Sequence, residues 1–342
     1  MIATRRAALC HPYRLISLVL AALLLAPQLA GAYLKFTFRV GGQTATLRWA
    51  RVPVRWFATN RGVPGVSAAD FQAAMTRAFT TWEAVPTASI RFQFAGFTGA
   101  EPGVDDDLSV LGFRDEPGLE RVLGATGFVV DAFTGEIIES DIFFNAAFAW
   151  STSTPGDPAR FDLESVALHE MGHFLGLGHS ALGETELLPQ GGRRVLASGA
   201  VMFPISMGRG RTLDRELQPD DIAGASDLYP DGDFRQRTGV ARGRVLRGGN
   251  GVFGAHVVAF NQRTGELVAG FSLNRQGEFE IAGLAPGAQI IRVEPLDDAD
   301  LDSFFGRADP VDIDFGVTFY ERLFIAPAGG VGGLFTVTVT PK

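Results

Sequence analysis

The stretch HEMGHFLGLGH, residues 169–179, decides how the whole chain is interpreted. Its first two histidines are four residues apart, so on a helix both imidazoles project from the same face. Gly176 interrupts that helix, because glycine adopts the left-handed conformation at a helix C-terminus without steric cost. The chain then turns back and brings up a third histidine. We therefore predict that His169, His173 and His179 hold one catalytic Zn²⁺ and leave its fourth position open to water.

A glutamate stands directly beside the first of these histidines. Glu170 cannot easily reach a metal held by its neighbours, but it can reach a water bound there. Zinc lowers the pKa of such a water to about 7. We predict that Glu170 is the general base, which takes the proton of the metal-activated water and passes it to the leaving amine of a peptide bond.

The histidines of this chain are unevenly distributed. Of the five, one precedes residue 33, three fall within residues 169–179, and the last is His256. The plain interpretation of a single histidine is a hydrogen-bonded imidazole without a metal, but such histidines have no reason to cluster. The clustering favours a metal site, and His256 is predicted to be an ordinary strand residue.

Residues 1–32 have the three-part pattern of a secretory signal peptide. Three arginines precede the apolar run Leu15–Ala26, and an A-x-A cleavage sequence ends at Ala32. We predict cleavage after Ala32 and secretion of the remainder. An N-terminal membrane anchor is the alternative, although twelve apolar residues are too few to span a bilayer. No later apolar stretch reaches that length, so no permanent membrane anchor is predicted.

Removal of residues 1–32 changes the charge and the cysteine content. The segment holds three arginines and no acidic residue, so the net charge moves from −8 to −8 − 3 = −11. An acidic chain argues against nucleic acid as a partner, since phosphate binding relies on clustered Lys and Arg. The single cysteine, Cys10, leaves as well, so the secreted part has neither disulfides nor thiol chemistry.

The remaining chain is predicted to form two domains. Residues 33–229 alternate strand-like stretches with three helices, which gives an α+β domain. Within it, residues 96–118 and 180–200 are predicted to be loops. The helices are expected from Ser67 to Pro86, from Leu163 to Leu175, and from Pro219 to Tyr229.

The second domain follows a short polar stretch. Residues 230–239 (PDGDFRQRTG) are turn-rich and are predicted to be a linker. Residues 240–342 contain short strands separated by glycine turns, which is typical of an all-β sandwich.

The spacing H-E-x-x-H-x-x-G-x-x-H is the metzincin signature. Metzincins also carry a methionine turn, and Met202 in SGAVMFP, residues 198–204, resembles the matrixin version of it. Ser180 follows the third histidine as it does in matrixins. The resemblance covers about residues 48–229 and is to a bacterial-type matrixin-like peptidase. It implies a twisted mixed sheet with three helices and a lower lobe that carries the third histidine and the methionine turn.

The resemblance also implies how a substrate would bind. It places an edge strand at Leu123, Gly124 and Ala125, to which an extended protein or peptide substrate would add as a further strand. It places the wall of the main side-chain pocket at Phe203, Pro204 and Ile205. In this family the methionine, here Met202, is not a ligand but an apolar floor beneath the zinc.

This chain departs from the family pattern in its other metal positions. Animal matrixins bind a second, structural zinc, but Phe143 occupies a place where a histidine would be expected, so we predict one zinc. The resemblance also suggests calcium at Asp131, Asp141 and Asn145, where the asparagine can still offer a carbonyl oxygen. A solvated turn explains these three residues equally well.

Residues 239–293 resemble carboxypeptidase-regulatory-like (transthyretin-type) β-sandwich modules. The resemblance lies mostly in turn glycines and alternating apolar residues, such as GEFEI at 277–281 and GLAPG at 283–287. Such modules carry no chemistry of their own. The resemblance implies a spacer, or a domain that binds a surface or a protein partner.

Three functions remain for the whole chain. The first is a secreted zinc-dependent endopeptidase. The second is a catalytically silent, secreted zinc-scaffold protein for binding or adhesion, which would tend to lose Glu170. The third is a zinc hydrolase of a non-peptide substrate, for which no sequence feature speaks. The presence of Glu170 favours the first.

Overall fold

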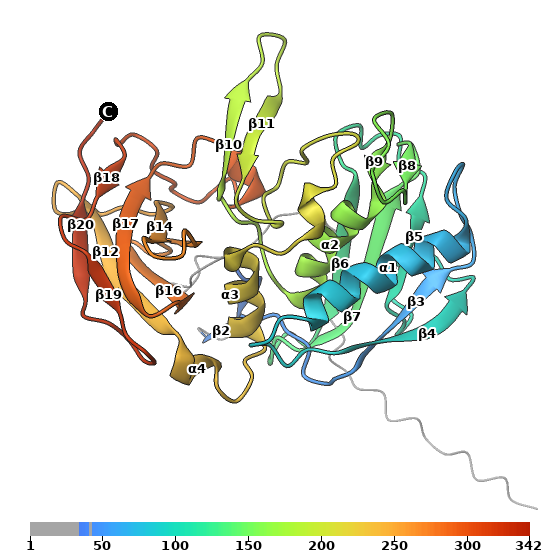
Figure 1. Ribbon diagram of the computed structural model, residues 1–342, viewed down its shortest axis with the longest axis horizontal. Coiled ribbons are helices and arrows are strands. Elements are labelled where there is room, and N and C mark those ends of the chain that lie inside the picture. Colours follow the sequence, from blue (N-terminus) through green and yellow to red (C-terminus); the bar gives the residue numbers. More distant parts are fainter. Residues whose placement is uncertain (1–33, 41–42) are drawn as a thin grey trace, which may run out of the picture.

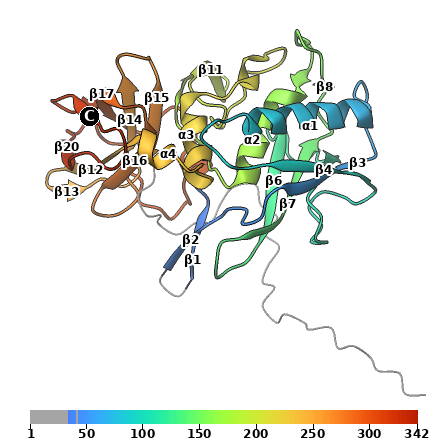
Figure 2. The same ribbon diagram turned by 60° about the horizontal axis from the view of Figure 1, so that its bottom comes forward.

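The computed structural model describes residues 34–40 and 43–342, so the predicted signal peptide, residues 1–32, lies outside the described residues. Figures 1 and 2 show two lobes side by side, with helix α3 (Pro219–Leu228) between the sheets of one lobe and those of the other. Along the described chain, no helix is both long and apolar enough to cross a membrane.

The first lobe is built on a five-stranded sheet in the order β4-β3-β5-β7-β6. Neighbouring strands are parallel except for β6, which lies antiparallel to β7 at one edge of the sheet. Two long helices, α1 (Ala68–Glu83) and α2 (Leu163–Leu175), pack against each other beside this sheet. The five strands are β3 (Val54–Thr59), β4 (Phe92–Thr98), β5 (Val110–Arg114), β6 (Gly124–Val130) and β7 (Ile137–Asn145).

Helix α1 (Ala68–Glu83) shows how local sequence sets this architecture. Ser67 caps its N-terminus by accepting a hydrogen bond from the backbone N–H of Asp70, whose carboxylate in turn accepts from the N–H of Ser67. Its buried residues recur at helical spacing and join β3 and β4 in one core. These residues are Phe71, Ala74, Met75, Ala78, Phe79 and Trp82. The predicted helix is confirmed.

Two stretches that the sequence predicts to be loops contain strands. Within residues 96–118, β5 lies parallel to both β3 and β7 in the middle of the sheet. Within residues 180–200, β10 (Gly183–Leu187) and β11 (Arg193–Ser198) form an antiparallel hairpin that projects beyond the body of the molecule in Figure 1. Both loop predictions are wrong. The partners of β5 lie far from it in the sequence, outside the window in which local patterns are read, whereas β10 and β11 pair with each other within the stretch predicted to be a loop.

The second lobe consists of two sheets. One has the order β13-β12-β16, with β20 added beside β12, and the other has the order β15-β14-β17-β18, with β19 added beside β17. Their strands are β12 (Gly239–Arg247), β13 (Asn250–Gly251), β14 (His256–Asn261), β15 (Leu267–Phe271), β16 (Glu278–Leu284), β17 (Gly287–Glu294), β18 (Thr318–Phe319), β19 (Phe324–Ala326) and β20 (Phe335–Thr338).

The two lobes share one hydrophobic core. Buried residues of the five-stranded sheet, of α3 and of both C-terminal sheets belong to a single cluster of packed side chains. Gly283 of β16 lies so close to α3 that a Cβ there would stand 2.7 Å from the Cβ of Ala223. The predicted linker holds a short helix, α4 (Phe234–Arg237), and Phe234 is buried. Phe234 therefore anchors residues 230–239 to the structure, although five of these ten residues are exposed.

Candidate active site

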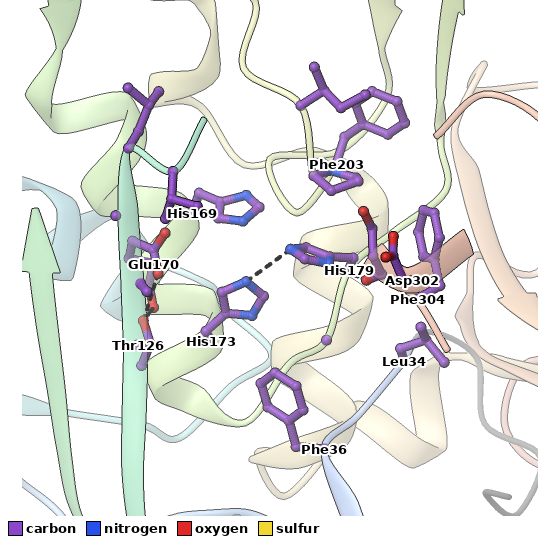
Figure 3. A pocket seen from close by; sticks show the side chains of 18 of the residues that line it. Leu34, Phe36, Thr126, His169, Glu170, His173, His179, Phe203, Asp302 and Phe304 are labelled. Atoms are coloured by element: carbon purple, nitrogen blue, oxygen red, sulfur yellow. Dashed lines mark hydrogen bonds between the residues drawn. The ribbon is translucent and has the colours of Figure 1, made fainter. Parts of the chain in front are cut away.

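Helix α2 (Leu163–Leu175) carries the first two histidines of the site. Asp162 caps its N-terminus, and Gly176, with a φ of 102°, ends it in the left-handed conformation. The chain then reverses, and the N–H of Gly178 donates to the carbonyl of Leu34. This turn brings His179 opposite His173, with 3.2 Å between their Nε2 atoms (Figure 3).

Each of the three imidazoles is oriented by a backbone carbonyl on its far side. The Nδ1 atoms of His169, His173 and His179 lie 2.7, 2.8 and 2.6 Å from the carbonyl oxygens of Val201, Leu177 and Ser303. A carbonyl oxygen can only accept, so each Nδ1 carries the proton. Each Nε2 therefore keeps its lone pair free.

The arrangement fits a zinc ion. One potential ligand atom from each of the three histidines lies within 4.8 Å of the others. Two nitrogens bonded to one tetrahedral zinc at 2.0–2.1 Å stand about 3.3 Å apart, close to the 3.2 Å found between His173 and His179. Burial lowers the pKa of His169 and, together with the neighbouring imidazoles, that of His173, and it lowers the pKa of His179 to about 3. The imidazoles are thus neutral, as metal ligands must be.

Glu170 points from the same helix toward strand β6. The hydroxyl of Thr126 lies 2.7 Å from its Oε2 and donates a hydrogen bond to it. Burial raises the pKa of the Glu170 carboxyl to about 7, against the lowering effect of that hydrogen bond. A Cβ at Gly124 would stand 3.1 Å from Cγ of Glu170, so a larger residue there would crowd the carboxylate. Sequence reasoning missed Thr126, although it lies two residues after Gly124 on the same strand face.

Met202 lies buried beneath the histidines, where Gly172 of α2 makes room for it. A Cβ at Gly172 would overlap the sulfur of Met202. The carboxylate of Asp221 fixes this turn by accepting from the N–H groups of Val201 and Met202, at 2.8 and 3.1 Å. Burial raises the pKa of Asp221 to about 6. Asp221 and Gly172 are further residues that sequence reasoning missed.

The histidines and Glu170 line a cavity of about 1070 Å³. Among the strands of the described residues, β6 pairs only with β7, and it borders the cavity along its unpaired side. All the residues predicted to bind substrate also line it, namely Leu123, Gly124, Ala125, Phe203, Pro204 and Ile205. The C-terminal lobe adds Asp302, Ser303 and Phe304 to the lining. Figure 3 shows Asp302 and Phe304 beside His179.

The predicted calcium residues are not brought together. Asp141 lies within β7, where it pairs with Gly127 of β6. Asp131 directly follows the end of β6, and Asn145 is the last residue of β7. Asp131 accepts from the N–H groups of Phe133 and Thr134 in a turn. The amide of Asn145 donates to three backbone carbonyls. This geometry offers no support for a calcium site at the three residues.

A mixed sheet, an active-site helix with H-E-x-x-H-x-x-G-x-x-H and a methionine turn define the metzincin class of zinc peptidases. Within that class, the chain belongs to the matrixin family, whose family model matches residues 48–230. That match covers the first lobe and stops at the point where the C-terminal lobe begins.

Curated relatives match stretches of about half of this chain. Metalloendoproteinase 4-MMP of Arabidopsis thaliana is 28% identical over 189 residues, which are 53% of this chain and 48% of that protein. Metalloendoproteinase 1-MMP of the same plant is 31% identical over 164 residues, 47% of this chain and 38% of that protein. Neutrophil collagenase of Homo sapiens is 29% identical over 183 residues, 53% of this chain and 33% of that protein. The chain thus spans half or less of the length of these relatives.

A solved structure, that of the Bacillus anthracis TIE protein, matches 31% of this chain and 17% of that chain at 14% identity. Its TM-score of 0.19 is too low to carry an argument about the fold.

Proposed function

We propose that this protein is a secreted zinc-dependent endopeptidase. His169, His173 and His179 hold one zinc ion, and Glu170 is the general base. The observation that carries the proposal is the common orientation of these groups. Three free Nε2 lone pairs and one buried carboxylate line the same cavity, beside the unpaired side of β6. Membership of the matrixin family supports it.

The residues divide the work of hydrolysis. The three imidazoles would hold a zinc ion, which would supply Lewis acidity for the peptide carbonyl and for the attacking water. Glu170 takes a proton from the attacking water and delivers it to the leaving nitrogen. Thr126 holds the carboxylate in place from β6.

The substrate is a protein or peptide in extended conformation. Strand β6 offers backbone N–H and C=O groups along its unpaired side, and Leu123 to Ala125 lie where an added strand would pair. Phe203, Pro204 and Ile205 form a wall of the cavity, against which one substrate side chain packs. Met202 forms the apolar floor under the metal site.

Cleavage of a peptide library by the wild type and by Glu170→Gln tests the mechanism. The variant keeps the shape of the side chain and removes the base, so we expect zinc content to stay the same and cleavage to fall about 100-fold or more. Glu321→Gln is the matched control, because Glu321 is exposed on the C-terminal lobe and does not line the cavity, and it should cleave like the wild type. Equal cleavage by wild type and Glu170→Gln contradicts the assignment.

The same preparations test the alternatives. A wild type that binds zinc but cleaves no peptide indicates the silent binding or adhesion scaffold. We expect one zinc per chain by elemental analysis, and two would contradict the single-site proposal. If the protein is secreted, N-terminal sequencing of the exported protein should begin at Tyr33. Recovery of the uncleaved chain in the membrane fraction would instead support an N-terminal membrane anchor.

A further inference from the structure

One of the three histidines is oriented from outside the matrixin region. His169 and His173 donate from Nδ1 to carbonyls of the first lobe, Val201 and Leu177. His179 donates instead to Ser303, 124 residues further along, at 2.6 Å. Ser303 ends a short 3₁₀ turn (Leu301–Ser303) of the C-terminal lobe.

The segment that carries Ser303 is fixed on both sides. After it, the N–H groups of Phe304 and Phe305 both donate to the carbonyl of Leu301, at 3.0 and 2.9 Å. The Phe304 ring lies 6.2 Å from the ring of His179. Before it, Asp298 accepts from the N–H of Thr185 in the hairpin of the first lobe, at 2.7 Å. The carbonyl is thus held in place by contacts with both lobes.

A second connection reaches the residue next to His179. Ser180 donates from its hydroxyl to Oδ2 of Asp220 at 2.7 Å. The other oxygen, Oδ1, accepts from the N–H of Ala269 in β15 at 2.8 Å. Asp220 is 2% exposed, so water does not compete for these bonds. Both the third histidine and its successor are therefore tied to the C-terminal lobe.

We propose that the C-terminal lobe is part of the catalytic centre, with Ser303 as a positioning residue for His179. The Ser303 carbonyl fixes the Nδ1–H tautomer of the ring and aims Nε2 at the point where Nε2 of His173 also converges. Groups that orient a metal ligand in this way raise the affinity for the metal. The lobe is therefore more than a spacer. This inference rests on the proposed metal site.

A backbone ester tests the carbonyl itself. Replacing Phe304 in the full chain by its α-hydroxy acid turns the Ser303–Phe304 bond into an ester, whose carbonyl is a weaker acceptor, and leaves every side chain unchanged. The same replacement at Phe305 is the matched control. Each ester removes one N–H bond to the carbonyl of Leu301, but only the first weakens the bond to His179.

Two measurements read out the position of the ligand. The dissociation constant for zinc, from competition with a chelator, should rise about 10-fold in the ester at 304 and stay within about twofold of wild type in the ester at 305. The visible spectrum of the Co²⁺-substituted protein should shift only in the first. Equal constants and spectra in both esters overturn the inference. A wild type that binds no zinc overturns the proposed metal site instead, so the two failures are distinguishable.

The connection through Asp220 provides a second test by side-chain substitution. Asp220→Ala removes both bonds, whereas Asp220→Asn keeps an oxygen for Ala269 and an amino group that donates to Ser180. We expect the zinc dissociation constant to rise in Asp220→Ala and to be restored in Asp220→Asn. An unchanged constant in a folded Asp220→Ala would contradict the role of this connection.

Discussion

The hydroxyl of Thr126 donates a hydrogen bond to the carboxylate of Glu170. This residue stands on β6, which also borders the cavity, so one strand both faces the substrate and holds the base. Gly172 acts from the other side, where it lets Met202 pass beneath the histidines. Thr126 and Gly172 thus each help to set the geometry of the candidate active site.

We expect Thr126→Val to lower kcat about 10-fold with little change in KM, because it removes the donor that orients Glu170 without altering the strand. Steady-state kinetics on one cleaved peptide measures both constants. Thr126→Ser keeps the hydroxyl and should retain most of the activity. A Thr126→Ser variant as slow as Thr126→Val would contradict the prediction, because it keeps the hydroxyl that donates to Glu170.

We expect Gly172→Ala to destabilise the protein by about 1 to 3 kcal/mol, because the added methyl group overlaps the sulfur of Met202. Urea unfolding followed by tryptophan fluorescence measures the change. The double variant Gly172→Ala/Met202→Ala should lose less stability than the sum of the two single variants. Removing the Met202 side chain relieves the crowding by the new methyl group, and that methyl group fills part of the cavity left by Met202. Strict additivity would place the clash elsewhere.

Strand β7 buries two carboxyl groups on one face. Glu139 and Asp141 are 3% and 5% exposed. Burial, together with the charge of Asp141, raises the pKa of Glu139 to about 7, and burial raises that of Asp141 to about 6. Asp106 faces both groups and also raises their pKa. In the folded protein, Glu139 and Asp141 therefore keep their protons to a higher pH than in the unfolded chain.

The raised pKa values of Glu139 and Asp141 predict how the free energy of unfolding depends on pH. The folded pKa values lie above the unfolded ones, so between about pH 4 and pH 7 the folded state holds protons that the unfolded state has lost. The stabilising contribution is complete at low pH and is lost as the pH rises through this range. We expect Glu139→Gln to flatten the decrease in the free energy of unfolding, measured by urea titration at several pH values. An unchanged slope contradicts the prediction.

At the scale of the whole molecule, the continuous core implies that both lobes unfold together. The four tryptophans, Trp49, Trp56, Trp82 and Trp150, all lie in the first lobe, so their fluorescence reports on that lobe alone. Phe279 is buried in the C-terminal lobe within the shared cluster. A change there should reach the tryptophans only if the lobes are coupled.

We expect Phe279→Ala to lower the urea midpoint of the tryptophan signal, at a cost of about 3 to 5 kcal/mol for the cavity it leaves. Phe319→Ala is the control, because Phe319 is 56% exposed on β18 of the same lobe and its loss should leave the midpoint unchanged. A tryptophan midpoint that does not respond to Phe279→Ala would show that the lobes unfold independently.

Sequence patterns predicted those helices whose ends and buried faces depend on residues close together in the chain. Helix α1 follows from the Ser67 cap and the spacing of its apolar residues, and α2 ends where Gly176 permits a positive φ. The histidine spacing pointed to one cluster, because positions i and i+4 of a helix share a face. The same kind of local pattern missed β5, whose five residues become a strand only between β3 and β7.

By itself, the sequence determined which side chains meet at the candidate centre: His169, Glu170, His173 and His179 lie within eleven residues, so helix geometry and one glycine turn suffice to assemble them. Only the tertiary structure decided what holds His179. The acceptor is the backbone carbonyl of Ser303, a group that every residue possesses, so its position 124 residues away leaves no signature in the sequence. Docking of the two lobes, through their shared core, brings it there.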